Sequence, residues 1–96
     1  MPSTEEDERA QCALIDEIRT YANGRMSDVE RGAETPEFAA LLTEKVGWGM
    51  NLAARALGFR VAAFVPEVDR LVARIDPEFA EHRRKRWAAR PARVGD

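Results

Sequence analysis

The residue types best suited to binding chemistry gather near the C-terminal end of this chain. Four cations and an indole follow one another there: Arg83, Arg84, Lys85, Arg86 and Trp87. Such cations can neutralise phosphates or carboxylates, and an indole beside them can stack on a nucleobase or pack against an arginine. The run is therefore a candidate partner-binding surface, for protein or for nucleic acid.

A second candidate is Trp48, which stands between Gly47 and Gly49. Helical spacing places Leu41 and Leu52 on the same side of a helix as this indole. An exposed aromatic residue on an apolar stripe is typical of a protein interface. The alternative is a core residue that closes the far side of a helical bundle, and the sequence leaves both interpretations open.

Residue types suited to catalysis or metal binding are scarce. The chain has one histidine, His82, and one cysteine, Cys12. We expect His82 to face solvent, because the neighbouring cations oppose metal binding, and we expect Cys12 to be a small buried residue. The carboxylates of Glu5–Glu8 and Asp16–Glu17 lack the Glu-x-x-His motif of di-metal bundles. We therefore predict no catalytic residue, no metal site, no cofactor, no small-molecule substrate and no enzyme activity.

Charge is distributed unevenly along the chain. Residues 1–48 carry 11 acids and 5 bases, whereas residues 49–96 carry 6 acids and 10 bases. A chain with one acidic and one basic part favours self-pairing, within one molecule or across a homodimer. Cations in the last turns of a helix also favour its dipole. The acidic start, Glu5–Glu8, is thus a possible counter-surface for the basic run.

Capping signals and helical spacing predict an all-α fold of four to five helices. No strand pattern or repeat is present. The expected elements are a first helix capped by Thr4 and ended by Asn23-Gly24, a short turn at 27–30, a long central helix at about 36–58, an apolar segment at 59–75 that restarts at Pro66, and a basic C-terminal helix at about 77–90.

The central helix is expected to bury one stripe of residues at spacings of three and four. The predicted stripe is Phe38, Leu42, Val46, Gly49, Ala53 and Ala56 or Leu57. A helical glycine costs about 1 kcal/mol relative to alanine, so it needs a packing reason. We expect a partner helix to cross closely at Gly49, and the alternative is a break at 47–49. The apolar segment 59–75 supplies most of the remaining core.

A DNA-binding helix-turn-helix is a weaker interpretation of residues 52–66. Leu52–Phe59 is similar to the first helix and turn of that motif, but the next residues, 60–66, are almost wholly apolar and end in Pro66. A recognition helix needs polar side chains for base edges. A pI near 5.5 is also low for a nucleic-acid-binding domain.

Length and composition indicate one globular domain over residues 1–96, with 1–3 and 92–96 frayed. Arg55 and Arg60 argue against a membrane span, and the polar start and single cysteine favour a cytoplasmic location. The favoured function is a non-enzymatic protein–protein interaction module, an adaptor, inhibitor or regulatory subunit that is itself homo-oligomeric. The alternative is a nucleic-acid-binding regulator that uses the basic C-terminal helix.

Overall fold

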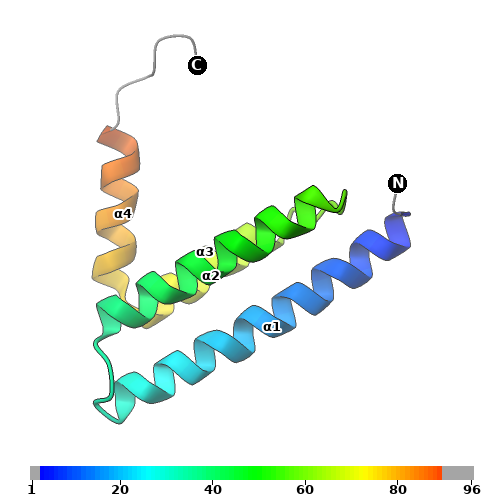
Figure 1. The fold of residues 1–96 in the computed structure, drawn as a ribbon. Helices are drawn as coiled ribbons and strands as arrows, with labels where there is room; N and C mark the ends of the chain where they lie inside the picture. Colours follow the sequence, from blue (N-terminus) through cyan, green and yellow to red (C-terminus); the bar gives the residue numbers. More distant parts are fainter. Residues whose placement is uncertain (1–2, 90–96) are drawn as a thin grey trace.

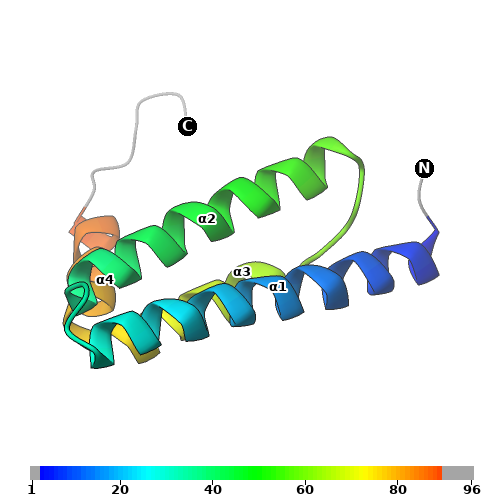
Figure 2. The same ribbon diagram turned by 60° about the horizontal axis from the view of Figure 1, so that its bottom comes forward.

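The computed structural model describes residues 3–89, with side chains to Arg86, and this range is all-helical (Figure 1). The four helices are α1 (Thr4–Glu30), α2 (Pro36–Ala56), α3 (Phe64–Ile75) and α4 (Pro77–Ala89). Helices α1, α2 and α3 each pack on the other two, and α4 packs mainly on α3 (Figure 2). Residues 1–2 and 90–96, which include most of the ends expected to fray, lie outside the described residues.

Helix α1 begins one residue earlier than expected, because Ser3 is the N-cap instead of Thr4. The Ser3 hydroxyl accepts a hydrogen bond from the Glu6 amide at 3.1 Å, and the Glu6 carboxylate accepts one from the Ser3 amide at 3.3 Å. This reciprocal capping box satisfies two backbone donors that a helix start leaves open. The first turn is also acidic, which suits the helix dipole.

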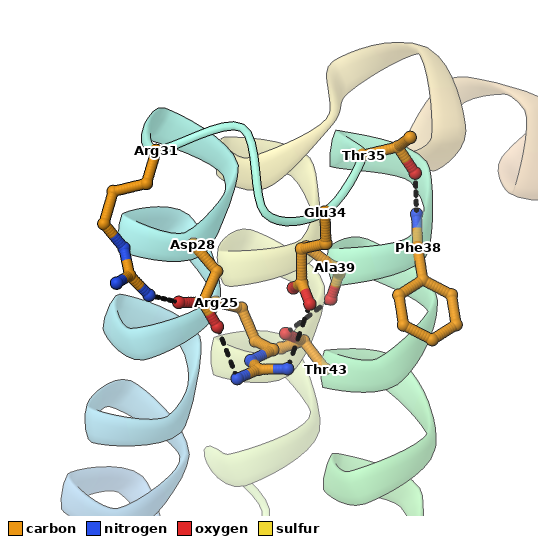
Figure 3. A network of polar contacts seen from close by, with 8 residues as sticks. All are labelled: Arg25, Asp28, Arg31, Glu34, Thr35, Phe38, Ala39 and Thr43. Atoms are coloured by element: carbon orange, nitrogen blue, oxygen red, sulfur yellow. Dashed lines mark hydrogen bonds and ion pairs between the residues drawn. The ribbon is translucent and has the colours of Figure 1, made fainter.

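The predicted end of the first helix at Asn23-Gly24 is wrong, and so is a separate turn at 27–30. Helix α1 runs through Gly24 to Glu30. Figure 3 shows what holds this extension: Arg25 donates to Asp28 on α1 at 2.6 Å and to Glu34 in the following linker at 3.1 Å. Met26 and Val29 are also partly buried. These contacts offset the cost of about 1 kcal/mol for one helical glycine.

The linker to α2 is short and tightly turned. Gly32 has a φ of 75°, in the left-handed region that glycine occupies without strain. Thr35 then caps α2 as predicted, with its hydroxyl accepting from the Phe38 amide at 3.2 Å (Figure 3), and Pro36 is the first helical residue.

Helix α2 is continuous through Gly47-Trp48-Gly49. The expected inner stripe is wrong in most of its members: Val46 packs against the core, whereas Phe38, Gly49 and Ala53 are exposed. The buried residues of α2 are Ala39, Ala40, Thr43, Glu44, Gly47 and Ala54. The close helix crossing occurs at Gly47, where an added Cβ would lie 2.7 Å from both Cγ atoms of Val68 on α3. A Cβ added at Gly49 would have no such contact within 4 Å. The small-residue contact therefore exists, on a different face of the helix from the one expected.

The segment at 59–75 contributes most of the core, as the sequence predicts. Its buried apolar residues are Val61, Phe64, Val68, Leu71 and Val72, and they pack around Ile18 and Ala22 of α1. Pro66 lies in the first turn of α3, where a missing amide proton costs nothing. Glu67 is buried on the same helix, and Arg19 of α1 donates to it at 2.5 Å, which ties α1 to α3.

Two side chains near the start of α1 accept hydrogen bonds from backbone amides of the connection between α2 and α3. The Asp7 carboxylate accepts from the Arg60 amide at 3.1 Å, and the Gln11 side-chain oxygen accepts from the Ala63 amide at 2.8 Å. The acidic start of α1 therefore lies at the end of the bundle where α2 finishes and α3 begins.

Helix α4 turns away from the three packed helices at the opposite end of the molecule (Figure 1). Asp76 caps it, accepting from the amides of Glu78 at 3.1 Å and Phe79 at 3.2 Å. The molecule is flat, with extents of 44 × 39 × 15 Å. Among the described residues, none of the helices combines the length and the apolar character needed to cross a membrane.

Candidate partner-binding site

Trp48 lies on α2 outside the buried core, and it lines a surface hollow together with Val65 of α3 and Ala80 of α4. Its side chain is 38% exposed, and the Lys45 ammonium lies 4.4 Å from its ring centroid. A cation over an exposed indole contributes about 0.5–1 kcal/mol. Of the two interpretations left open by the sequence, the structure favours the exposed aromatic, because Trp48 does not belong to the buried core.

The exposed large apolar side chains of the described residues all belong to α2 or to its C-cap. They are Phe38, Leu41, Trp48, Leu52 and Leu57. The first four form one face, which we call the outer row. At 100° per residue, the outer row is centred about 160° around the helix from the mean direction of the buried alanine, threonine and glycine residues. Leu41 and Leu52 thus share the side of Trp48, as predicted, and Phe38 joins them instead of the core.

Arg83 is the residue of the basic run that α4 uses to attach itself to the bundle. Its guanidinium donates to Glu44 on α2 at 2.5 Å and to Asp69 on α3 at 2.8 Å. Glu44 is 4% exposed, so its charge is almost fully removed from water. Burial alone would lower the pKa of Arg83, but the hydrogen bonds to Asp69 and Glu44 outweigh it and raise the pKa. Arg83 therefore acts as a structural tether between α4 and the bundle.

The other members of the basic run lie on the outside of α4. Arg84 donates to Glu81 one turn earlier at 2.6 Å, and both groups are exposed. Lys85 and Arg86 are exposed, and neither makes an ion pair with another of the described residues. Trp87 belongs to α4 by its backbone, and its side chain lies outside the described residues. The basic run is thus divided by role. Arg83 ties α4 to the bundle, Arg84 pairs with Glu81, and Lys85 and Arg86 face solvent.

Two shallow hollows flank the Arg83 tether, where α4 leaves the bundle. One is lined by Trp48, Val65, Asp69, Ala80, Arg83 and Arg84. The other is lined by Glu37, Leu41, Glu44, Lys45, Phe79, His82, Arg83 and Arg86. Trp48 and Leu41 of the outer row therefore border α4, so that the two sequence candidates, the indole and the basic helix, adjoin. We call this corner between α2 and α4 the elbow.

The acidic start of α1 is not the counter-surface of the basic run within one molecule. Glu5–Glu8 lie at the end of α1 that packs near Arg60, whereas α4 stands at the other end (Figure 1). A helix of 27 residues is about 40 Å long, which separates the two charged regions. The acids that Arg83 does use, Glu44 and Asp69, were missed by sequence reasoning. A carboxylate inside an apolar helix signals a buried ion pair, but nothing local identifies a partner 39 residues away.

The remaining candidates for chemistry are isolated. His82 is exposed, as predicted, whereas Cys12 is exposed and was expected to be buried. Cys12 points outward because it lies beside, and not on, the face that carries Ile18 and Ala22. Within residues 3–86, no three His, Cys, Asp or Glu side chains gather closely enough to hold a metal ion.

No protein-family model matches this chain, and no match was found among curated proteins or solved structures.

Proposed function

We propose that this chain is a non-enzymatic protein-interaction module whose binding surface is the outer row of α2 together with the elbow beside α4. The observation that carries the proposal is the position of Phe38, Leu41, Trp48 and Leu52. Four large apolar side chains on one helix face, each between 37% and 68% exposed in a single molecule, are unfavourable unless something else packs on them.

The contacts that hold this surface in place also support the proposal. Arg83 fixes α4 to both α2 and α3, and the contact of Gly47 with Val68 fixes the rotation of α2. The surface is therefore already formed before a partner binds. This chain loses little conformational entropy on binding as a result. Trp48 is the expected centre, because aromatic residues in the middle of an interface contribute most of the binding energy.

Nucleic-acid binding is the second candidate, and it rests on Lys85 and Arg86. These two cations are exposed on α4 without an acidic partner among the described residues. Arg83 and Arg84 already bind carboxylates, so fewer cations remain for phosphates than the sequence alone implies. We therefore place this function behind protein binding.

The test is affinity capture with matched baits. We expect one or more proteins, copies of this chain included, to be retained by the wild type and lost with Trp48→Ala and with Leu52→Asp. They should be kept by Ala13→Asp, which places a charge on the exposed side of α1. If all four baits retain the same proteins, the outer row is not the binding surface.

A parallel measurement addresses nucleic acid. Retention on DNA that falls steeply with salt, and that is lost in the Lys85→Ala/Arg86→Ala variant but kept in Trp48→Ala, would support the second candidate instead.

A further inference from the structure

Helix α2 is apolar on two opposite sides. One side carries Gly47 and packs on α1 and α3, and the other side is the outer row. A helix that is apolar on both sides normally lies between packed layers. The smallest extent of the molecule, 15 Å, is about what two packed helix layers require. The outer row is therefore the face of α2 on which a further layer of helices would pack.

We propose that a second copy of this chain supplies that layer, with the two α2 helices antiparallel across a two-fold axis near Lys45. This inference rests on the proposed function and names its partner.

The outer row is self-complementary about Lys45. In an antiparallel pair, positions equally distant from the axis face one another, so Phe38 meets Leu52 of the second copy and Leu41 lies against Trp48 of the second copy. Gly49, where an added Cβ would point into open space in one molecule, then faces Leu41 of the second copy and leaves room for it. Such a contact gives this exposed helical glycine a packing reason.

The ammonium of Lys45 does not oppose this arrangement. It is held over the Trp48 ring at 4.4 Å and lies 3.9 Å from the Glu44 carboxylate. Both contacts give the charge a partner within its own copy, which reduces the repulsion between the two lysines at the axis.

Charge favours a second copy over an unrelated partner. The exposed acids Glu5, Glu6 and Glu8 lie at one end of the molecule, and the exposed cations Lys85 and Arg86 lie on α4 at the other (Figure 1). An antiparallel two-fold axis exchanges these ends. It brings α4 of each copy toward the start of α1 of the other, where opposite charges attract and set the register. An unrelated partner must bring its own acidic surface, whereas a second copy already has one.

Sedimentation equilibrium on the full chain tests the assembly. We expect a dimer for the wild type, and we expect Trp48→Ala to raise the dimer dissociation constant about 30-fold or more. Leu52→Asp should give a monomer, because it buries an unpaired carboxylate in the interface. Ala13→Asp is the matched control and should remain a dimer. Circular dichroism checks that each variant keeps its helices, which the exposure of positions 48 and 52 leads us to expect.

Charge reversal tests the antiparallel register. Lys85→Glu/Arg86→Glu alone should weaken the dimer, and so should Glu5→Lys/Glu8→Lys alone, a pair that leaves the capping box of Ser3 and Glu6 intact. The chain that carries all four changes should recover wild-type affinity, because the attraction is restored with exchanged signs. An additive loss in the fourfold variant would overturn the antiparallel arrangement, even if a dimer forms.

The two proposals fail in different ways. A strictly monomeric wild type whose outer row captures another protein in a Trp48-dependent manner would overturn the second copy as occupant and leave the interaction surface standing. A dimer whose affinity is unchanged by Trp48→Ala and Leu52→Asp would overturn this inference, and unchanged capture by the same variants would overturn the proposed function.

Discussion

Gly47 of α2 and Val68 of α3 are in such close contact that an added Cβ would lie 2.7 Å from both methyl carbons of the valine. Val68 is buried and has a stiff, branched side chain, so it has little freedom to withdraw. This contact sets how near α2 and α3 approach. It also sets which side of α2 faces the core and hence which side carries Trp48.

Gly47→Ala should lower the free energy of unfolding. Overpacking costs about 1–3 kcal/mol, and the gain in helix propensity of about 1 kcal/mol offsets part of it. Gly24→Ala is the matched control, because Gly24 is inside α1 with nothing within 4 Å, and it should stabilise the fold by about 0.5–1 kcal/mol. Denaturant titration measures both values. Adding Val68→Ala should relieve the clash, and two glycine variants of equal stability would contradict the contact.

Arg83→Met should destabilise the fold by about 1–3 kcal/mol, because it leaves the buried Glu44 carboxylate without its main partner. The neighbouring Arg84→Met removes only an exposed pair with Glu81, so its melting temperature should stay close to that of the wild type. Thermal unfolding compares the two. Hydrogen exchange should also show faster exchange in α4 for Arg83→Met. Equal effects of the two substitutions would contradict the role of Arg83 as a tether.

The exposed pair on α4 should make a small, pH-dependent contribution to its helicity. The hydrogen bond from Arg84 lowers the pKa of Glu81 below its ordinary value of 4.5. Because folding lowers this pKa, the stabilisation is complete above pH 4.5 and is lost as the pH falls through the lower folded value. Glu81→Gln should therefore reduce helicity at pH 7, with the difference disappearing in acid. In an Arg84→Met background the difference at pH 7 should be smaller, because only the weaker attraction of Lys85 for Glu81 remains, and circular dichroism measures it.

Cys12 should react in the native state. Its side chain is exposed on α1, so a thiol reagent should label one cysteine per chain without denaturant and at nearly the rate measured for the unfolded protein. Labelling that requires denaturant would show that the thiol is covered, for example by a partner on α1.

Local signals identified much of the helical framework. Thr35-Pro36 at the start of α2 and Asp76-Pro77 at the start of α4 cap or begin their helices as expected, because capping depends on residues close in sequence. The end of α1 was not found. Its Gly24 resembles a stop, and only the contacts of Arg25 with the distant Glu34 and the burial around it carry the helix further.

The candidate site was predicted in part. Trp48 with Leu41 and Leu52 was identified from helical spacing, whereas Phe38 was assigned to the core. The basic run was identified as a group, but the different roles of Arg83 and Arg84 were not. An ion pair between residues 39 positions apart leaves no periodic pattern in a sequence.

By itself, the sequence determined the all-helical class, the main helix starts and the apolar segment that forms the core. Those features follow from capping chemistry and from side-chain periodicity over one or two turns. Only the tertiary structure decided which side of α2 is buried. Helix α2 is apolar almost all round, so its periodicity does not choose a face, and the close approach permitted by the bare backbone of Gly47 against Val68 does. The same packing separates Glu5–Glu8 from α4 and leaves the row around Trp48 facing outward.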